Sequence, residues 1–369
     1  RRRGCACKRV DIRCRQENIR RDRHRLRRDS TMKILITGGA GFLGQRLARE
    51  LLKTQQKQII TELVLADIAP LRDAVLLADP RVRSVTGDLR QLLADGVMSG
   101  IEGVFHLAAA VSGECEADID VGLHTNLDTT RALLDACRSL MQPPRLVFSS
   151  SLAVYGGNMP EVIADNTLPM PQNSYGTQKF ICEQLIADYT RKGFLDGRSV
   201  RLPTVTVRPG KPNKAASGFM SGIIREPLAG VDTVCPVDPQ TGVWITSPRF
   251  AVAGLIAAFN TPREQWGGRT AMNLPGLSVR VAEMIAALER CAGGGGAAVA
   301  ARVRVQQDET ISTIVGGWPW RFDPVRAGAL GLRGPASMDD IVAEYIADYP
   351  AAVAVAAPTT DAQIGRAHV

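Results

Sequence analysis

The stretch MKILITGGAGFLG, residues 32–44, joins a short apolar run to three glycines at three-residue spacing. The apolar residues 34–37 predict a buried strand, and the amphipathic period of residues 42–52 predicts a helix directly after the turn. A strand, a glycine turn and a helix in this order present backbone N–H groups and the positive end of the helix dipole to an anion. The stretch therefore predicts an α/β fold that begins with a site for a dinucleotide pyrophosphate.

Each glycine of the turn has its own mechanical task. Gly38 makes the tight turn, Gly41 lets the backbone approach a phosphate, and Gly44 lets the helix pack against the strand. A glycine triplet alone is a weak signal, and a turn that binds nothing is the alternative. The strand and helix around this triplet favour the binding site, with two further contacts expected from its helix start, Phe42 and Leu43.

A second predicted strand, residues 63–66, ends in Asp67, at the distance where an acid meets the adenine ribose. Because this carboxylate would repel the 2′-phosphate of NADP, it favours NAD as the cofactor. Asp88 follows the third predicted strand and is expected either to contact the adenine or to act as a plain turn carboxylate. Other cofactor contacts are expected at small or apolar residues near later strand ends: Leu89, Leu107, Ala108 and Ala109.

Strand and helix patterns keep alternating as far as about residue 207, which predicts parallel pairing in a Rossmann-like doubly wound sheet. We expect an NAD-binding domain at residues 32–208 and a smaller, partly discontinuous substrate-binding lobe at 209–350. The predicted elements are strands at 82–86, 104–107 and 145–149, and helices at 117–140, 281–290 and 338–349, with a glycine turn at 293–296.

The charge of the chain is concentrated in its first residues. The 369 residues carry a net charge of +8, and residues 1–31 alone hold 13 Lys and Arg against 4 Asp and Glu. This stretch lacks an apolar period and a hydrophobic signal core, and Met32 lies directly before the first predicted strand. We expect a basic extension outside the fold, with an RNA-binding arm as the alternative, and we place residues 351–369 outside the fold as well because 364–369 resemble a translated adapter.

Cysteine and histidine usage points away from disulfides and metals. Five cysteines lie scattered after residue 31 without a C-x-x-C pair, which predicts reduced thiols in a cytoplasmic protein. His106 and His124 belong to no cluster with ligand spacing, so we expect no metal. No apolar run is long enough to span a membrane.

The chemistry is expected at Tyr175 and Lys179, which lie four apart at the start of a predicted helix. A lysine ammonium and a bound nicotinamide cation would both favour the phenolate, so Tyr175 is the expected general base. The serines at 149–151 end the fifth predicted strand; we expect Ser151 to bind the substrate oxygen, with Ser150 as second choice. Asn126, in the long predicted helix, is expected to brace the cofactor site.

The ordered motifs identify the chain as similar to the extended short-chain dehydrogenase/reductases, the NAD-dependent epimerase/dehydratase family. They are GGAGFLG, Asp67, GDL at 87–89, HLAA at 106–109, FSSSLAVYG at 148–156, YGTQK at 175–179 and RPG at 208–210. The resemblance implies that Gly38, Gly41, Gly44 and Asp67 bind the cofactor, that Ser151 and Tyr175 are catalytic and that Lys179 serves both tasks. It also implies a homodimer.

The segment 208–230 departs from the pattern of sugar-nucleotide epimerases and resembles the group that oxidises D-erythronate at C2 with NAD. A small hydroxy acid needs a cation for its carboxylate, and the candidates are Arg225 together with Lys211 or Lys214. The alternative is that these cations are solvated or bind a diphosphate. We expect Ser112 and Gly113 in the same pocket. The alternatives are a UDP-hexose 4-epimerase and a non-catalytic NAD-binding regulatory protein; neither nucleic acid nor membrane is an expected partner.

Overall fold

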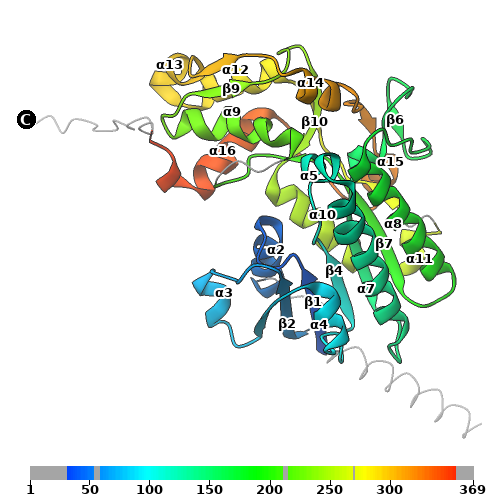
Figure 1. The fold of residues 1–369 in the computed structure, drawn as a ribbon. Coiled ribbons are helices and arrows are strands. Elements are labelled where there is room, and N and C mark those ends of the chain that lie inside the picture. The colour runs from blue at the N-terminus through cyan, green and yellow to red at the C-terminus, as the bar shows by residue number, and fades with distance from the viewer. Residues whose placement is uncertain (1–30, 54–58, 211–214, 269–270, 355–369) are drawn as a thin grey trace, which may run out of the picture.

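Strand β1 (Thr31–Thr37) lies inside a seven-stranded sheet in the computed structural model, which describes residues 31–53, 59–210, 215–268 and 271–354 (Figure 1). All paired strands of this sheet run parallel, in the order β11-β7-β5-β4-β1-β2-β3. The doubly wound α/β fold is therefore confirmed. The other strands are β2 (Ile59–Asp67), β3 (Val82–Thr86), β4 (Gly103–His106), β5 (Arg145–Ser151), β7 (Asp196–Leu202) and β11 (Ala271–Asn273).

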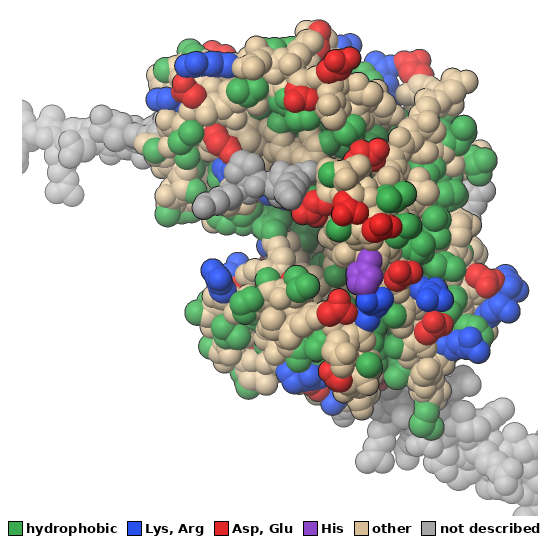
Figure 2. Space-filling view, in the orientation of Figure 1, with side chains coloured by type: hydrophobic (Ala, Val, Ile, Leu, Met, Phe, Trp, Pro, Cys, Tyr) green, Lys and Arg blue, Asp and Glu red, His purple; other side chains and the backbone are tan. Residues whose placement is uncertain are grey.

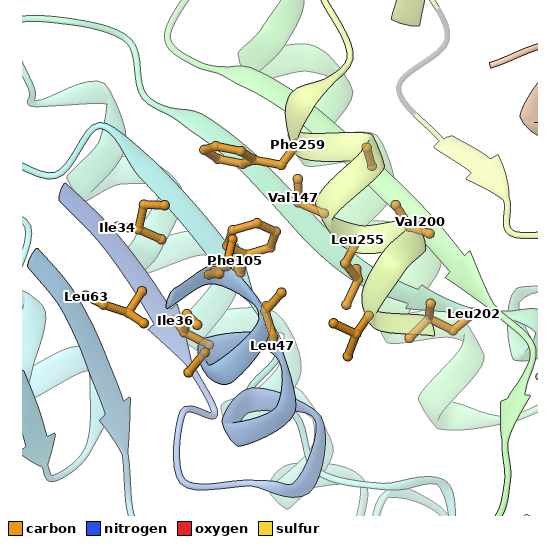
Figure 3. Close-up of a cluster of buried hydrophobic side chains, with 14 of the residues drawn as sticks. Ile34, Ile36, Leu47, Leu63, Phe105, Val147, Val200, Leu202, Leu255 and Phe259 are labelled. Carbon is orange, nitrogen blue, oxygen red and sulfur yellow. The ribbon is translucent and has the colours of Figure 1, made fainter. Parts of the chain in front are cut away.

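The sheet is buried on both faces, as a continuous apolar strand such as β1 requires. One face carries Ile34 and Ile36 and packs against α2 (Phe42–Lys53) and α10 (Pro248–Asn260) (Figure 3). The opposite face, with Leu35, packs against α7 (Thr129–Arg138) and α8 (Ser174–Arg191).

A second hydrophobic core forms the upper part of the molecule (Figure 1). Three helices, α9 (Phe219–Leu228), α12 (Val281–Cys291) and α16 (Met338–Asp348), pack there against short strands. β11 comes from the second half of the chain yet joins the main sheet beside β7. The domain boundary at residue 208 stays a prediction.

The remaining elements are short. The strands are β6 (Ile163–Ala164), β8 (Thr204–Val205), β9 (Thr233–Cys235), β10 (Gly242–Thr246), β12 (Leu277–Arg280), β13 (Val303–Val305) and β14 (Phe322–Asp323). The helices are α3 (Ala74–Ala78), α4 (Leu89–Ala94), α11 (Arg263–Trp266), α13 (Gly296–Ala300), α14 (Glu309–Gly316) and α15 (Val325–Ala329), with 3-10 turns η2 (Leu152–Val154), η3 (Ala216–Gly218), η4 (Gly293–Gly295) and η5 (Pro350–Ala352).

The long helix predicted at 117–140 is present as one helical run that begins at Ile119 and ends at Arg138, and it contains a π-helical turn that was not predicted. The chain forms α5 (Ser112–Ala117), α6 (Ile119–Gly122), a π-helical turn η1 (Leu123–Asp128) and then α7. Asp118 separates the first two helices, because its carboxylate accepts hydrogen bonds from the backbone N–H groups of Asp120 and Val121 and so begins a new helix. The predicted extension, residues 1–31, and the tail lie almost wholly outside the described residues.

Candidate active site

A cavity of about 520 Å³ opens at the carboxyl ends of β1, β2, β4 and β5, where a doubly wound sheet binds its ligands. Figure 2 shows a hollow between the lower and upper parts of the molecule. The structure brings most of the predicted residues together in the lining of this cavity. These are Gly38, Gly41, Phe42, Leu43, Gly44, Asp67, Asp88, Leu89, Leu107, Ala108, Ala109, Ser112, Ser150, Ser151, Tyr175 and Lys179.

The glycine turn has the shape that a phosphate cradle needs. Gly38 has a φ of +71°, which favours glycine, and a Cβ there would lie 2.8 Å from the backbone nitrogen of Ala108. A Cβ on Gly44 would overlap the carbonyl oxygen of Gly38. The first turn of α2 can therefore pack tightly against the end of β1, and the residues present fit a dinucleotide.

Asp67 ends β2 with its carboxylate held beside this turn. One oxygen accepts a 3.0 Å hydrogen bond from the N–H of Ala40, and the other accepts one of 3.0 Å from Ala69. Asp88 caps α4 by accepting from the N–H groups of Arg90 and Gln91, and it also lines the cavity. Asp88 therefore caps a helix at the rim of the cavity, and its contact with the adenine stays a prediction.

Tyr175 and Lys179 lie one turn apart near the start of α8, a helix that is capped by the side chain of Asn173. The Lys179 ammonium donates a 2.9 Å hydrogen bond to the carbonyl oxygen of Ser149 and lies 5.6 Å from the centre of the Tyr175 ring. Lys179 is 2% exposed, and this burial lowers its pKa to about 8. The pair therefore links α8 to the end of β5 inside the cavity.

The expected lowering of the Tyr175 pKa is not produced by the protein groups by themselves. Burial raises the pKa of Tyr175 to about 12, while a hydrogen bond with Ser151 and the charge of Arg208 lower it. Desolvation of the phenolate thus outweighs the nearby positive groups. A cation supplied by a bound cofactor would act in the direction that the general base requires.

The three serines at the end of β5 have different partners. Ser149 donates to the carbonyl oxygen of His106, and Ser150 donates a 2.5 Å hydrogen bond to the buried carboxylate of Glu183. The Ser151 hydroxyl instead interacts with Tyr175 and accepts from the N–H of Ala153. This arrangement favours Ser151 over Ser150 as the serine beside the reacting oxygen.

Asn126 lies beneath the cavity and is absent from its lining. Its amide oxygen accepts a 2.8 Å hydrogen bond from the N–H of Ala110, and its nitrogen donates to the side chain of Gln178. The bracing contact is thus present, whereas direct contact with a cofactor is not supported by this position. Gly113 is absent from the lining too.

Arg225 is also misplaced by the sequence-based expectation. It is 7% exposed, and its guanidinium donates to the carbonyl oxygen of Arg208 at 2.6 Å and to Glu226 at 2.5 Å. It does not line the cavity, and its guanidinium is held by these two partners. Lys211 and Lys214 lie outside the described residues.

Several cavity residues were not predicted as site residues. They come from the π-helical turn and from the upper part of the molecule: His124, Thr125, Thr204, Arg208, Ser217 and Trp318. Arg208 was noted only as part of the RPG motif. The indole nitrogen of Trp318 is buried without a hydrogen-bond partner among the described residues.

The described part of the chain contains no group of histidine, cysteine and acidic residues that could hold a metal ion. Its five cysteines are free thiols. In the same residues, no helix is long and apolar enough to cross a membrane.

A nicotinamide-dinucleotide site on a doubly wound sheet, with a tyrosine and a lysine one helical turn apart beside it, defines an NAD-dependent oxidoreductase. The chain belongs to the NAD dependent epimerase/dehydratase family, whose model matches residues 34–238. Two similar relatives are D-erythronate dehydrogenases. The protein from Cupriavidus necator is 51% identical over 86% of this chain and 98% of its own length, and that from Haemophilus influenzae is 44% identical over 85% and 99%.

A solved structure agrees in fold. The nucleoside-diphosphate-sugar epimerase from Agrobacterium tumefaciens superposes with a TM-score of 0.81 at 39% identity, over 88% of this chain and 96% of that one. L-threonine 3-dehydrogenase from Trypanosoma brucei, at 23% identity and a TM-score of 0.75 over 86% of this chain and 97% of that one, shares the fold.

Proposed function

We propose that this protein oxidises D-erythronate at C2 to 2-dehydro-D-erythronate, with NAD as the electron acceptor. The observation that carries the proposal is the meeting of Tyr175, Lys179 and Ser151 in the cavity that also contains the glycine turn. The two D-erythronate dehydrogenases, which this chain covers almost completely, support the choice of substrate.

Each residue has a task that follows from its position. The glycine turn would hold the pyrophosphate of the cofactor, Asp67 would accept from its adenine ribose, and Lys179 would hold its nicotinamide ribose. Ser151 donates a hydrogen bond to the C2 oxygen, and Tyr175 removes the proton from the C2 hydroxyl. NAD held in this cavity would supply the acceptor for the hydride from C2. The substrate thereby loses one hydride and one proton, and its C2 hydroxyl becomes a ketone.

NADH formation distinguishes this function from the alternatives. The purified protein is mixed with NAD and with four- to six-carbon aldonic acids, uronic acids or UDP-hexoses, and absorbance at 340 nm is followed. We expect NADH with D-erythronate above the other acids. Interconversion of UDP-hexoses without net NADH would indicate an epimerase, and NAD binding without any turnover would indicate a regulatory protein.

We further propose a homodimer in the cytoplasm. Apolar side chains are exposed on α6 and α8, with Ile119 at 58%, Val121 at 43% and Ile181 at 37%, and a second copy would cover them. The free thiols agree with a reducing compartment. Light scattering after size exclusion tests the dimer, and cell fractionation tests the location.

A further inference from the structure

We propose that Arg208 binds the carboxylate of the substrate and that Arg225 acts only as a positioning residue for Arg208. This inference rests on the proposed function, because it names the recognition of a 2-hydroxy acid at the same site. It replaces the role expected for Arg225 with a role for a residue that lines the cavity.

Arg208 lies where a 2-hydroxy acid needs a cation. It lines the cavity close to Tyr175, and its positive charge acts to lower the pKa of the phenol. Burial and the charge of Arg225 lower the pKa of Arg208 itself, and Tyr175 opposes this. The carboxylate of a 2-hydroxy acid is attached to the carbon that reacts. When the C2 hydroxyl is at Tyr175, the carboxylate must therefore lie within one bond of the reacting carbon, beside the general base.

Lys179, the other cation of the lining, is held at the end of β5. Among the described residues that line the cavity, the Lys and Arg side chains are Lys179 and Arg208. Lys179 donates to the carbonyl oxygen of Ser149 and packs over the Phe148 ring, 4.6 Å from its centre. A guanidinium also offers two parallel donors that match the two oxygens of a carboxylate, which an ammonium does not.

Helix α9 fixes the backbone of Arg208 from both sides. The N–H of Arg208 donates a 3.0 Å hydrogen bond to the hydroxyl of Ser221, and its carbonyl oxygen accepts one of 2.6 Å from Arg225. Glu226 pairs with the guanidinium of Arg225 at 2.5 Å and neutralises it. Arg225 therefore serves as a donor to the backbone of the residue that recognises the substrate.

This arrangement predicts that the site prefers substrates that carry a carboxylate beside the reacting carbon. A neutral amide of the same carbon skeleton offers no negative charge to Arg208, and the sugar of a UDP-hexose is likewise neutral at its reacting carbon. The contribution of Arg208 should therefore appear in the affinity for the acid and should be absent from the affinity for NADH.

The test compares D-erythronate with its neutral amide, D-erythronamide, for the parent protein and for Arg208→Gln, Arg208→Lys, Arg225→Gln and Arg225→Lys. The matched control is Arg304→Gln, on an upper-part side chain that is 74% exposed and pairs with Asp232. Steady-state kinetics give KM and kcat, and quenching of bound NADH fluorescence gives the Kd of each ligand on the NADH-loaded protein. The Kd of NADH and the Tm show that each variant is folded.

We expect Arg208→Gln to raise the KM and Kd of D-erythronate about 10- to 100-fold, as loss of charge-assisted hydrogen bonds does. The Kd of D-erythronamide and that of NADH should stay within about twofold. Arg208→Lys keeps the charge without the paired donors, so it should weaken the acid several-fold yet still prefer it to the amide. This variant also decides the matter if Arg208→Gln does not fold.

Arg225→Gln should raise the KM for the acid about fivefold with little change in kcat, and Arg225→Lys should restore most of it, since an ammonium can still donate to the Arg208 carbonyl. If the parent oxidises D-erythronate and Arg208→Gln leaves its KM and its preference over the amide unchanged, the inference is overturned while the proposed function stands. A folded parent that forms no NADH from D-erythronate overturns the function itself.

Discussion

The Nδ1 atom of His106 lies 2.6 Å from the hydroxyl oxygen of Thr37, so the ends of β4 and β1 are joined directly beneath the glycine turn. On its other side the imidazole meets the hydroxyl of Thr130 at 2.9 Å. His106 is fully buried, and burial lowers its pKa to about 3, with the charge of Lys179 acting in the same direction. The histidine is therefore a neutral structural link between the floor of the cofactor site and α7.

This link predicts a loss of stability in acid. Above pH 6.5 neither the folded nor the unfolded chain holds a proton on His106. Below it the unfolded chain takes one up, whereas the folded chain does not until the pH approaches 3. The free energy of unfolding should therefore fall by about 2 kcal/mol from this group between pH 7 and pH 5.

Urea unfolding at the two pH values measures this effect in the parent, in His106→Gln and in the control His124→Gln, which changes an exposed histidine. Between pH 7 and pH 5, the free energy of unfolding of His106→Gln should fall by about 2 kcal/mol less than that of the parent. That of the control should fall as much as in the parent. An equal fall in the parent and in His106→Gln would rule out His106 as its source.

Gly44→Ala should damage the cofactor site. The added methyl group would overlap the Gly38 carbonyl oxygen, so α2 must shift away from β1, at a cost of about 1–3 kcal/mol. We expect a lower Tm and an NADH affinity at least about tenfold weaker, since the helix N-terminus would leave its position. Thermal unfolding and NADH fluorescence titration measure the two effects.

The matched control is Gly316→Ala at the end of α14, where an added Cβ would meet nothing within 4 Å. It should leave both the Tm and the NADH affinity near those of the parent. A Gly44→Ala protein that is as stable as this control and binds NADH as tightly would contradict the close packing of α2 against the end of β1.

Asp67→Asn should weaken the preference for NAD over NADP. The asparagine keeps the shape of the side chain beside Ala40 but removes the charge that repels the 2′-phosphate. We expect the ratio of kcat/KM for NAD to that for NADP to fall at least about tenfold. Asp95→Asn, on an exposed residue after α4, should leave the ratio unchanged. If Asp67→Asn leaves this ratio unaltered, another residue determines the preference for NAD over NADP.

The features that depend on short stretches of chain were predictable. Glycine spacing requires the turn at Gly38, and the carboxyl ends of parallel strands must share one edge, which places Asp67 and Ser151 together. The four-residue spacing of Tyr175 and Lys179 places them on one face of a helix. These relationships need no knowledge of how the upper part packs.

The features that depend on tertiary packing were not predictable. Arg208 lines the cavity, whereas the guanidinium of Arg225 on α9 donates to the Arg208 carbonyl oxygen, and both residues are equally cationic in the sequence. The raised pKa of Tyr175 follows from burial that its neighbours in sequence do not specify. The start of the long helix at Ile119 depends on the capping contacts of Asp118, and its π-helical turn has no signal in the sequence.

The most direct test of the account compares Tyr175→Phe with Tyr189→Phe, a control on the same helix at a half-buried tyrosine that donates to Asp135. The rate of NADH formation from D-erythronate should fall about 10²- to 10⁴-fold in Tyr175→Phe with NADH affinity retained, and stay near the parent rate in Tyr189→Phe. A Tyr175→Phe protein that forms NADH at close to the parent rate would contradict the role of Tyr175 as the general base.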